Sequence, residues 1–405
     1  MKTVLFVDDE PNVLNGLRRT LHAMEKEWEM VFCDNPLQAI EWITQGRHFD
    51  VVISDMQMPA MHGSEFLGRV MALDPLTVRL ALSGHTDANN LMRSNVVAHQ
   101  FLSKPADPRK LVSLVKRACV LRDRLSSATL SQKLLMVGGV PSVPRVYEHI
   151  LEEIQSSDPS VPRVAPWIEK DVGLTSKVLQ LVNSAFMGLK NHVSDIRQAC
   201  TLLGLEHLRV LVLMAEIFSM AQDTPLRRYL NLDALWARSM QIAEYAGKIA
   251  TELTSERIQI SDAYTAGLLH EIGQIILAQR LPDEFGKAFE YAETHKVSLF
   301  DAEKELFGST HATISGYLLE LWGLPDPIVE AVTYYDFPSG LPEASYDLGE
   351  DESGIALVAL HVAAYLASSE TSPMKTTMPV EIDSSYLESR GLMKHMERWY
   401  DLCLS

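Results

Sequence analysis

The chain has 405 residues, of which 47% are hydrophobic and 22% charged, a composition typical of soluble globular proteins with about two or three domains. Its net charge of -17 argues against an output domain that binds DNA, because nucleic-acid-binding domains usually carry a basic face. No apolar run reaches the length of a membrane span, the start does not resemble a signal peptide, and the four cysteines lack CxxC spacing. We therefore expect a cytoplasmic protein with free thiols and no membrane insertion.

Acidic residues end two apolar runs in the first part of the chain. Asp8 and Asp9 follow Thr3–Val7, and Asp55 follows Asp50–Ser54. Short β-branched runs separated by helical patterns predict parallel strands of an α/β sheet, whose carboxyl ends converge on one crevice. Carboxylates gathered there raise each other's pKa unless a cation neutralises them. A small hard cation such as Mg²⁺ fits this role, and a phosphoryl group can then be transferred to one carboxylate.

Two later runs end in groups that bind phosphoryl oxygens. Arg79–Ser83 ends in a hydroxyl and Gln100–Lys104 ends in an ammonium group. An aspartate after a single strand is usually only a turn residue. Four such elements in this order, each at the end of a predicted strand, predict a site for phosphoryl transfer.

This combination of motifs resembles the receiver domain of two-component response regulators, and the resemblance covers residues 1–122. It implies a doubly wound, flavodoxin-like α/β fold with a five-stranded parallel sheet of order 2-1-3-4-5. It also implies that a sensor histidine kinase or a phosphotransfer protein phosphorylates Asp55. No motif position is replaced, so we expect an active receiver rather than one that has lost phosphorylation.

The resemblance assigns a role to each residue of the site. Asp9, Asp55 and the backbone carbonyl of Gln57 are expected to bind Mg²⁺, with Asp8 acting largely through water. Ser83 and Lys104 are expected to hold the phosphoryl group. Phe101 corresponds to the aromatic switch position of the family, and the peptide bond between Lys104 and Pro105 is expected to be cis.

An apolar stripe at helical spacing follows this region, at Leu111, Leu114, Val115, Ala118 and Leu121. Two interpretations remain open. The stripe is either the last receiver helix or the start of a coiled-coil seam that would make the protein a homodimer. The polar run from Ser126 to Thr129 interrupts the repeat, which favours the first interpretation, with residues 123–137 as a linker.

Helical patterns dominate the rest of the chain, and the absence of a repeated period favours a compact all-α bundle over a solenoid. The predicted helices are Tyr147–Ile154, Leu174–Val182, Ile196–Leu203, Leu208–Ala215, Leu235–Thr251, Ala263–Gln279, Ala302–Leu306, Thr313–Leu321, Pro327–Thr333, Ile355–Ser368 and one or two within Ser384–Leu404.

Five phrases in this part resemble the HDOD domain, a helical module related to the HD metal-dependent phosphohydrolases. They are Val140–Pro144, Lys177–Ala185, Ala199–Gly204, Gly267–Gly273 and Leu321–Pro325. We assign residues 138–338 to this domain. Residues 339–405 are then a helical extension, expected to pack on the HDOD domain; a partner-binding or dimer surface is the alternative.

The HD relatives hydrolyse phosphodiesters with His and Asp ligands around one or two metal ions. Here the resemblance places those ligand positions at Arg238, His270, Glu271, His311, Tyr334, Tyr335 and Ala364. Most of these residues are replacements, and a guanidinium repels a metal, so we expect no cofactor in this domain. His361 lies three residues before Ala364, which leaves open a site formed with His270, Glu271 and His311. Interior histidines with hydrogen-bonded nitrogens are the favoured interpretation.

Taken together, the sequence predicts a response regulator in which Mg²⁺-dependent phosphorylation of Asp55 controls a non-catalytic HDOD domain. That domain is expected to act through an unidentified protein partner. Two alternatives remain: a metal-dependent phosphohydrolase that acts on cyclic dinucleotides, and a nucleotide-binding sensor that binds without turnover.

Overall fold

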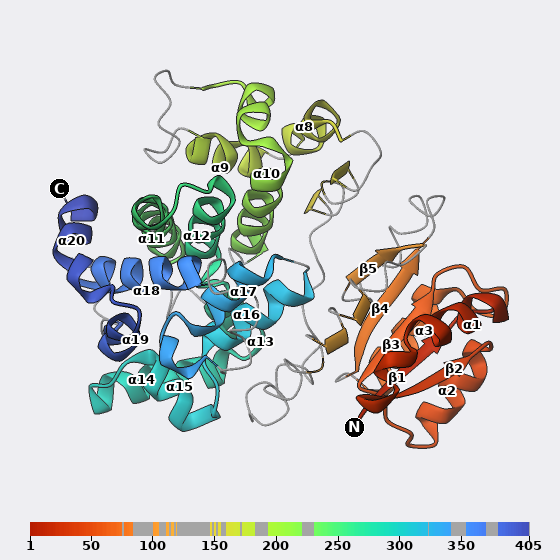
Figure 1. Ribbon diagram of the computed structural model, residues 1–405. Coiled ribbons are helices and arrows are strands. Elements are labelled where there is room, and N and C mark those ends of the chain that lie inside the picture. Colours follow the sequence, from red (N-terminus) through yellow and green to blue (C-terminus); the bar gives the residue numbers. More distant parts are fainter. Residues whose placement is uncertain are drawn as a thin grey trace. The chain divides into compact units, whose positions relative to one another are not determined.

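The computed structural model describes residues 1–74, 77–83, 100–104, 159–170, 172–182, 193–220, 231–322, 324–341, 354–369 and 380–404, with single residues between 111 and 154. These form two compact units that meet in sequence near Val143. Figure 1 shows the elements of both units coloured along the chain, a strand-containing unit in red to orange and a helical unit in yellow-green to blue.

The first unit is built on a parallel sheet with the order β2-β1-β3-β4-β5. Its strands are β1 (Lys2–Val7), β2 (Trp28–Cys33), β3 (Val51–Asp55), β4 (Val78–Ser83) and β5 (Gln100–Ser103). The register pairs Val7 with Ser54 and Ser83 with Ser103, so that the predicted site residues follow strands that end at one edge. The predicted α/β fold and strand order are confirmed.

Helices cover both faces of this sheet, which is why its strands are nearly continuous apolar runs. Leu5 and Val7 belong to a core cluster with side chains of α2 (Pro36–Thr44) and α3 (Gly63–Leu73). On the other face Phe6 stacks on Phe32, with ring centroids 4.9 Å apart, and Arg18 of α1 (Pro11–Thr20) lies over Phe32. The sheet is therefore doubly wound, as the sequence predicts.

The second unit is helical throughout its described residues (Figure 1). Its α-helices are α8 (Val161–Glu169), α9 (Val172–Val182), α10 (Ile196–Met220), α11 (Leu232–Leu253), α12 (Arg257–Leu269), α13 (Ile272–Arg280), α14 (Pro282–His295), α15 (Leu299–Phe307), α16 (His311–Leu321), α17 (Asp326–Tyr334), α18 (Gly354–Ser369), α19 (Ser384–Ser389) and α20 (Met396–Leu404). Helices α11, α12, α17 and α18 pack against one another and form its centre. The predicted all-α architecture is confirmed.

Three details of the helical prediction were wrong. Helix α8 was not predicted. The single helix expected over Ala263–Gln279 is two helices, because the backbone leaves the helical path at Glu271 (φ -96°, ψ 2°) between α12 and α13. Helix α14 was not predicted; Pro282 suggested a break, whereas proline is favourable in the first turn of a helix, where its missing N–H costs nothing.

The C-terminal elements lie against the rest of the helical unit. Helix α20 contacts α11, and an ion pair joins Arg398 to Glu252. Trp399 and Cys403 on α20 are buried, as are Tyr386 and Leu387 on α19. Burial of these large side chains stabilises the packed segment by roughly 1.5–3 kcal/mol for each fully buried residue.

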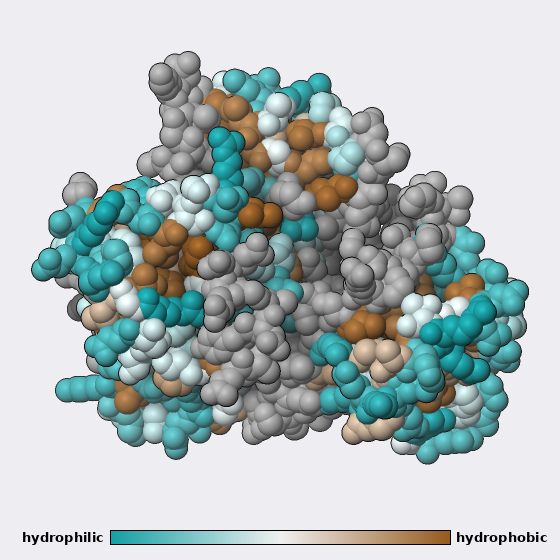
Figure 2. Space-filling view, viewed as in Figure 1, coloured by the Kyte–Doolittle hydropathy of each residue, from teal (hydrophilic) through white to brown (hydrophobic). Residues whose placement is uncertain are grey.

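Within the described residues no single helix is long and apolar enough to cross a membrane, although the bent pair Ile196–Leu205 and His207–Ala215 passes the same test of length and composition. On the face shown in Figure 2, hydrophilic residues cover much of the described surface and hydrophobic residues gather in separate patches.

Candidate functional site

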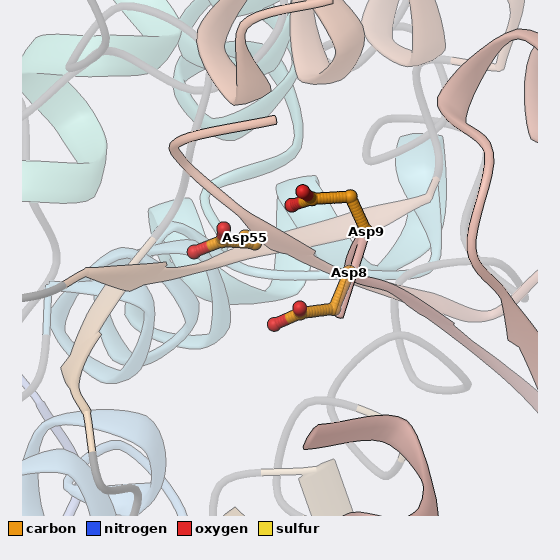
Figure 3. Close-up of side chains that lie close together, drawn as sticks. All are labelled: Asp8, Asp9 and Asp55. Atoms are coloured by element: carbon orange, nitrogen blue, oxygen red, sulfur yellow. The ribbon is translucent and has the colours of Figure 1, made fainter. Parts of the chain in front are cut away.

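Three aspartates meet at the carboxyl edge of the sheet. Asp8 and Asp9 follow β1, and Asp55 is the last residue of β3, which pairs directly with β1. Figure 3 shows their carboxylates directed toward a common region, and one oxygen from each lies within 4.8 Å of the others. Among the described residues this is the one group of three or more potential metal ligands with such spacing.

Lys104 extends from the residue after β5 to two of these carboxylates. Its Nζ lies 2.6 Å from Asp55 Oδ1 and 2.7 Å from Asp8 Oδ2. Burial raises the pKa of Asp55, and the contact with Lys104 opposes this rise only in part. Burial lowers the pKa of Lys104, but the hydrogen bonds to Asp55 and Asp8 outweigh it, so that the net shift is upward. The ammonium group is therefore charged and held beside Asp55.

The loop after β3 is fixed closely against Asp55. A Cβ atom added at Gly63, the first residue of α3, would lie 2.2 Å from the carbonyl oxygen of Asp55. The N–H of Gly63 donates to the carbonyl of Met56, and His62 caps α3 by accepting from the N–H of Ser64. Because only glycine permits this approach, α3 and the loop that carries Gln57 hold a defined position next to the site.

The remaining predicted receiver residues are placed by the backbone. Ser83 ends β4 opposite Ser103, and Phe101 lies in β5 opposite Ala81. Gln57 is exposed in the loop after Met56. The side chains of Ser83 and Phe101, and the peptide bond to Pro105, lie outside the described residues, so the cis bond and the switch position stay predictions.

The donor set suits Mg²⁺. Carboxylate oxygens are the ligands that this hard cation prefers. Three ionised aspartates and the one ammonium of Lys104 sum to a net charge of -2, which a single divalent cation balances. The aspartates also leave the site open on one side, since Asp9 is half-buried while Asp8 and Asp55 are buried. Such a site accommodates the waters that Mg²⁺ retains.

The helical unit contains a second buried polar cluster, at the break between α12 and α13. Glu271 Oε1 lies 3.2 Å from His270 Nε2, and Glu271 Oε2 lies 3.5 Å from His311 Nε2. Tyr335 occupies the same region, because its hydroxyl lies 3.3 Å from His311 Nε2 and its ring packs edge-on against His270. Four of the residues at the predicted HD ligand positions thus lie together: His270, Glu271, His311 and Tyr335.

Two residues that sequence reasoning missed complete this cluster. Glu303 is fully buried and accepts hydrogen bonds from both the backbone N–H and Nδ1 of His311, each at 2.8 Å. Gln274 donates to Glu271 Oε2 and lies 3.3 Å from His311 Nε2. Gln274 could have been found from the sequence, because it lies three residues after Glu271 and such residues are neighbours on a helix. Glu303 could not, because only the turn between α15 and α16 brings it to His311.

Electrostatic interactions within the cluster are strong. Burial alone would raise the pKa of Glu271, but its interactions with His270, His311 and Arg238 lower it to about 2. Burial alone would lower the pKa of His311, but the carboxylates of Glu303 and Glu271 raise it above its usual value. The cluster therefore contains its own compensating charges.

A metal of the HD type does not fit these residues. His361, a fourth ligand only in the alternative that the sequence left open, uses both ring nitrogens within the protein: Nδ1 lies 2.7 Å from the Tyr335 carbonyl, and Nε2 accepts from the N–H of Asp383 at 2.9 Å. Ala364 is buried on α18, and its methyl side chain offers no atom that could bind a metal. Tyr334, which precedes Tyr335, is half-buried. Protein groups also surround His311 Nε2, so no open coordination position remains at that nitrogen.

Comparisons with known proteins agree with both halves of this description. The family model for the response regulator receiver domain matches residues 4–116, and the model for the HDOD domain matches residues 140–338. A solved HDOD domain protein of unknown function from Geobacter sulfurreducens covers 70% of this chain, with a TM-score of 0.51 and 24% identity, and the chain covers 89% of it. That likeness shows the fold.

Two curated proteins are similar over about half of the chain. The cyclic di-GMP phosphodiesterase response regulator RpfG of Xanthomonas campestris pv. campestris is 25% identical over 229 residues, which are 54% of this chain and 54% of that protein. An uncharacterised protein of Treponema pallidum is 25% identical over 207 residues, which are 51% of this chain and 39% of that protein. The chain thus spans about half or less of each of these relatives.

Proposed function

Because this chain belongs to the response regulators that carry a receiver domain followed by an HDOD domain, we propose that phosphorylation of Asp55 controls the HDOD domain, which acts by contact with another protein. The observation that carries this proposal is the convergence of Asp8, Asp9, Asp55 and Lys104 at one edge of the receiver sheet. The donor of the phosphoryl group is a sensor histidine kinase or a phosphotransfer protein, and the reaction takes place in the cytoplasm.

In this proposal an Oδ of Asp55 attacks the phosphorus of a phosphohistidine, and the bond from phosphorus to the histidine nitrogen breaks. Bound Mg²⁺ supplies charge neutralisation for the phosphoryl oxygens. Lys104 already lies beside the nucleophile, so a small movement of its Nζ brings it to a phosphoryl oxygen. Ser83 supplies a hydroxyl to another oxygen. The product carries a charge of about -2 where the carboxylate carried -1.

The residues at the HD ligand positions support an HDOD domain without catalytic activity. The positions that relatives use for metal ligands hold a tyrosine, an alanine and an arginine, at Tyr335, Ala364 and Arg238. The two retained histidines, His270 and His311, face the carboxylate of Glu271, which the protein's own charges neutralise. A domain of this kind transmits a signal through its surface rather than through chemistry.

We expect phosphorylation to change the helical unit of the intact chain. Acetyl phosphate with Mg²⁺ should alter amide hydrogen exchange in the HDOD domain or the sedimentation of the protein, because a switch requires a differential free energy of roughly 3–5 kcal/mol between its two states. Asp55→Asn and Ser83→Ala should suppress the change, whereas Asp34→Asn, an exposed aspartate of the same unit, should leave it intact. Identical exchange and assembly in both states would contradict control of the HDOD domain by the receiver.

A metal-dependent phosphohydrolase is the second candidate, because RpfG, which is 25% identical to this chain over 229 residues, is a cyclic di-GMP phosphodiesterase response regulator. We expect the purified chain to hold no stoichiometric transition metal outside the receiver and to leave cyclic dinucleotides intact in the presence of Mn²⁺ or Fe²⁺. Metal analysis and chromatography of the nucleotides measure this. Turnover that disappears in His311→Ala would establish the enzyme instead, and binding of a nucleotide without turnover would establish a sensor.

A further inference from the structure

Asp383 joins three segments of the helical unit. It is the N-cap of α19, and its Oδ1 accepts from the backbone N–H of Tyr386 at 3.0 Å. Its Oδ2 accepts from the backbone N–H of Ser339, in the loop after α17, at 2.8 Å. Its own N–H donates to Nε2 of His361 on α18 at 2.9 Å. Such a set of contacts at one residue fixes where the C-terminal segment leaves the core.

His361 requires one protonation state for these contacts. Its Nε2 accepts from the N–H of Asp383, so this nitrogen carries no proton, and Nδ1 therefore donates to the carbonyl of Tyr335 at 2.7 Å. The ring is fully buried, and this burial lowers the pKa of His361 although Asp383 and Asp336 oppose the shift. Near neutral pH the imidazole is thus uncharged and both hydrogen bonds are present.

The same contacts connect the C-terminal segment to the second polar cluster, around Glu271 and His311. Tyr335 receives the hydrogen bond from His361 through its carbonyl and contacts His311 through its hydroxyl, and His311 in turn is bonded to Glu303. A continuous series of polar contacts therefore runs from Asp383 to α15. Beyond Asp383 the segment is held mainly by apolar burial, at Tyr386, Leu387, Trp399 and Cys403.

We propose that Asp383 and His361 form a latch that holds the C-terminal segment, residues 380–404, on the rest of the helical unit, and that opening of the latch favours release of the segment while the other helices stay folded. The latch opens when His361 gains a second proton, because the imidazolium cannot accept from the N–H of Asp383. The charged or titratable groups that act on His361 among the described residues are Asp383 from α19 and, after α17, Asp336. Release uncovers apolar surface on the helices beneath the segment. This inference goes beyond the proposed function, since the latch is independent of Asp55.

Hydrogen exchange of the full chain tests the latch. Asp383→Ala and His361→Leu should each raise exchange in residues 380–404 by about tenfold or more. The first variant loses the side-chain acceptor for the N–H groups of Ser339 and Tyr386, and the second loses the ring acceptor for the backbone N–H of Asp383. Peptides from α11 and α12 should keep their protection. Glu388→Ala, at an exposed position on α19, is the matched control and should leave exchange unchanged. An effect of Asp383→Ala without one of His361→Leu would show that only the cap of α19 is lost and would overturn the latch.

A pH series provides a second readout that simple packing would not give. In the wild-type chain, exchange in residues 380–404 should rise as the pH falls through the pKa of His361, relative to exchange in α11 and α12. His361→Gln retains one donor and one acceptor but does not titrate, so it should remove this dependence. An equal acid response in His361→Gln, or loosening of the whole unit at once, would contradict the proposal.

Discussion

Replacing Asp55 with asparagine is expected to abolish phosphorylation of the chain by acetyl phosphate in the presence of Mg²⁺. The amide of asparagine is not a nucleophile, whereas the Asp55 carboxylate lies at the carboxyl edge of the sheet with Lys104 Nζ 2.6 Å away. Incorporated phosphate, or the mass increase of the intact protein, measures the result. Asp34→Asn makes the same chemical change at an exposed residue of the same unit and should be phosphorylated like the wild type.

Removal of Mg²⁺ should have nearly the same effect as loss of Asp55. Three carboxylates within 4.8 Å of one another repel an incoming phosphoryl group unless a divalent cation balances them. Asp9→Ala takes away one carboxylate ligand and should lower the affinity for Mg²⁺. Phosphorylation that persists in Asp55→Asn, or that persists after chelation of Mg²⁺, would contradict the assignment of Asp55 as the phosphoacceptor.

The receiver half could be predicted closely from sequence because its signals are local. Each functional aspartate directly follows an apolar run, and in a parallel sheet the ends of such runs meet at one edge. Asp8, Asp9 and Asp55 therefore come together as expected. The short distance between Lys104 and Asp55 was harder to predict from the sequence, because it depends on how far the lysine side chain reaches across the intervening strand β4.

The helical half was predicted less completely because its site depends on packing between helices. The break at Glu271 turns α13 against α16, where Gly273 is needed because a Cβ atom would lie 2.1 Å from the carbonyl of His311. A pattern of apolar residues does not reveal such a break, since the residues on both sides of it, from 263 to 278, are all buried. Glu303 and Asp383 were missed for the same reason. Each acts on a residue of another helix: Glu303 on His311 in α16, and Asp383 on His361 in α18.

Replacing Glu303 with glutamine is expected to destabilise the helical unit by about 3–5 kcal/mol near neutral pH, because it removes the carboxylate nearest to the buried charge of His311 and, among the described residues, leaves only Glu271 beside it. Glu303 and His311 are both buried, at 0% and 1% exposure, and their Oε2 and Nδ1 atoms lie 2.8 Å apart. Protection of amides in α11 and α12 against hydrogen exchange measures the change. Glu305→Gln alters an exposed glutamate on the same helix and should have little effect.

The dependence on pH separates the charge of His311 from its packing. The pKa of His311 in the folded chain is raised above its usual value of 6.5 by Glu303 and Glu271, which outweigh burial. Below 6.5 the histidine is protonated in both the folded and unfolded states, so its full contribution to stability is present. As the pH rises through the folded-state pKa this proton is lost, and the contribution is lost with it. In Glu303→Gln the folded-state pKa should fall toward or below 6.5, and the loss of stability at alkaline pH should disappear. If Glu303→Gln were to destabilise the unit equally at all pH values, Glu303 would act through packing alone and His311 would be neutral in the wild type.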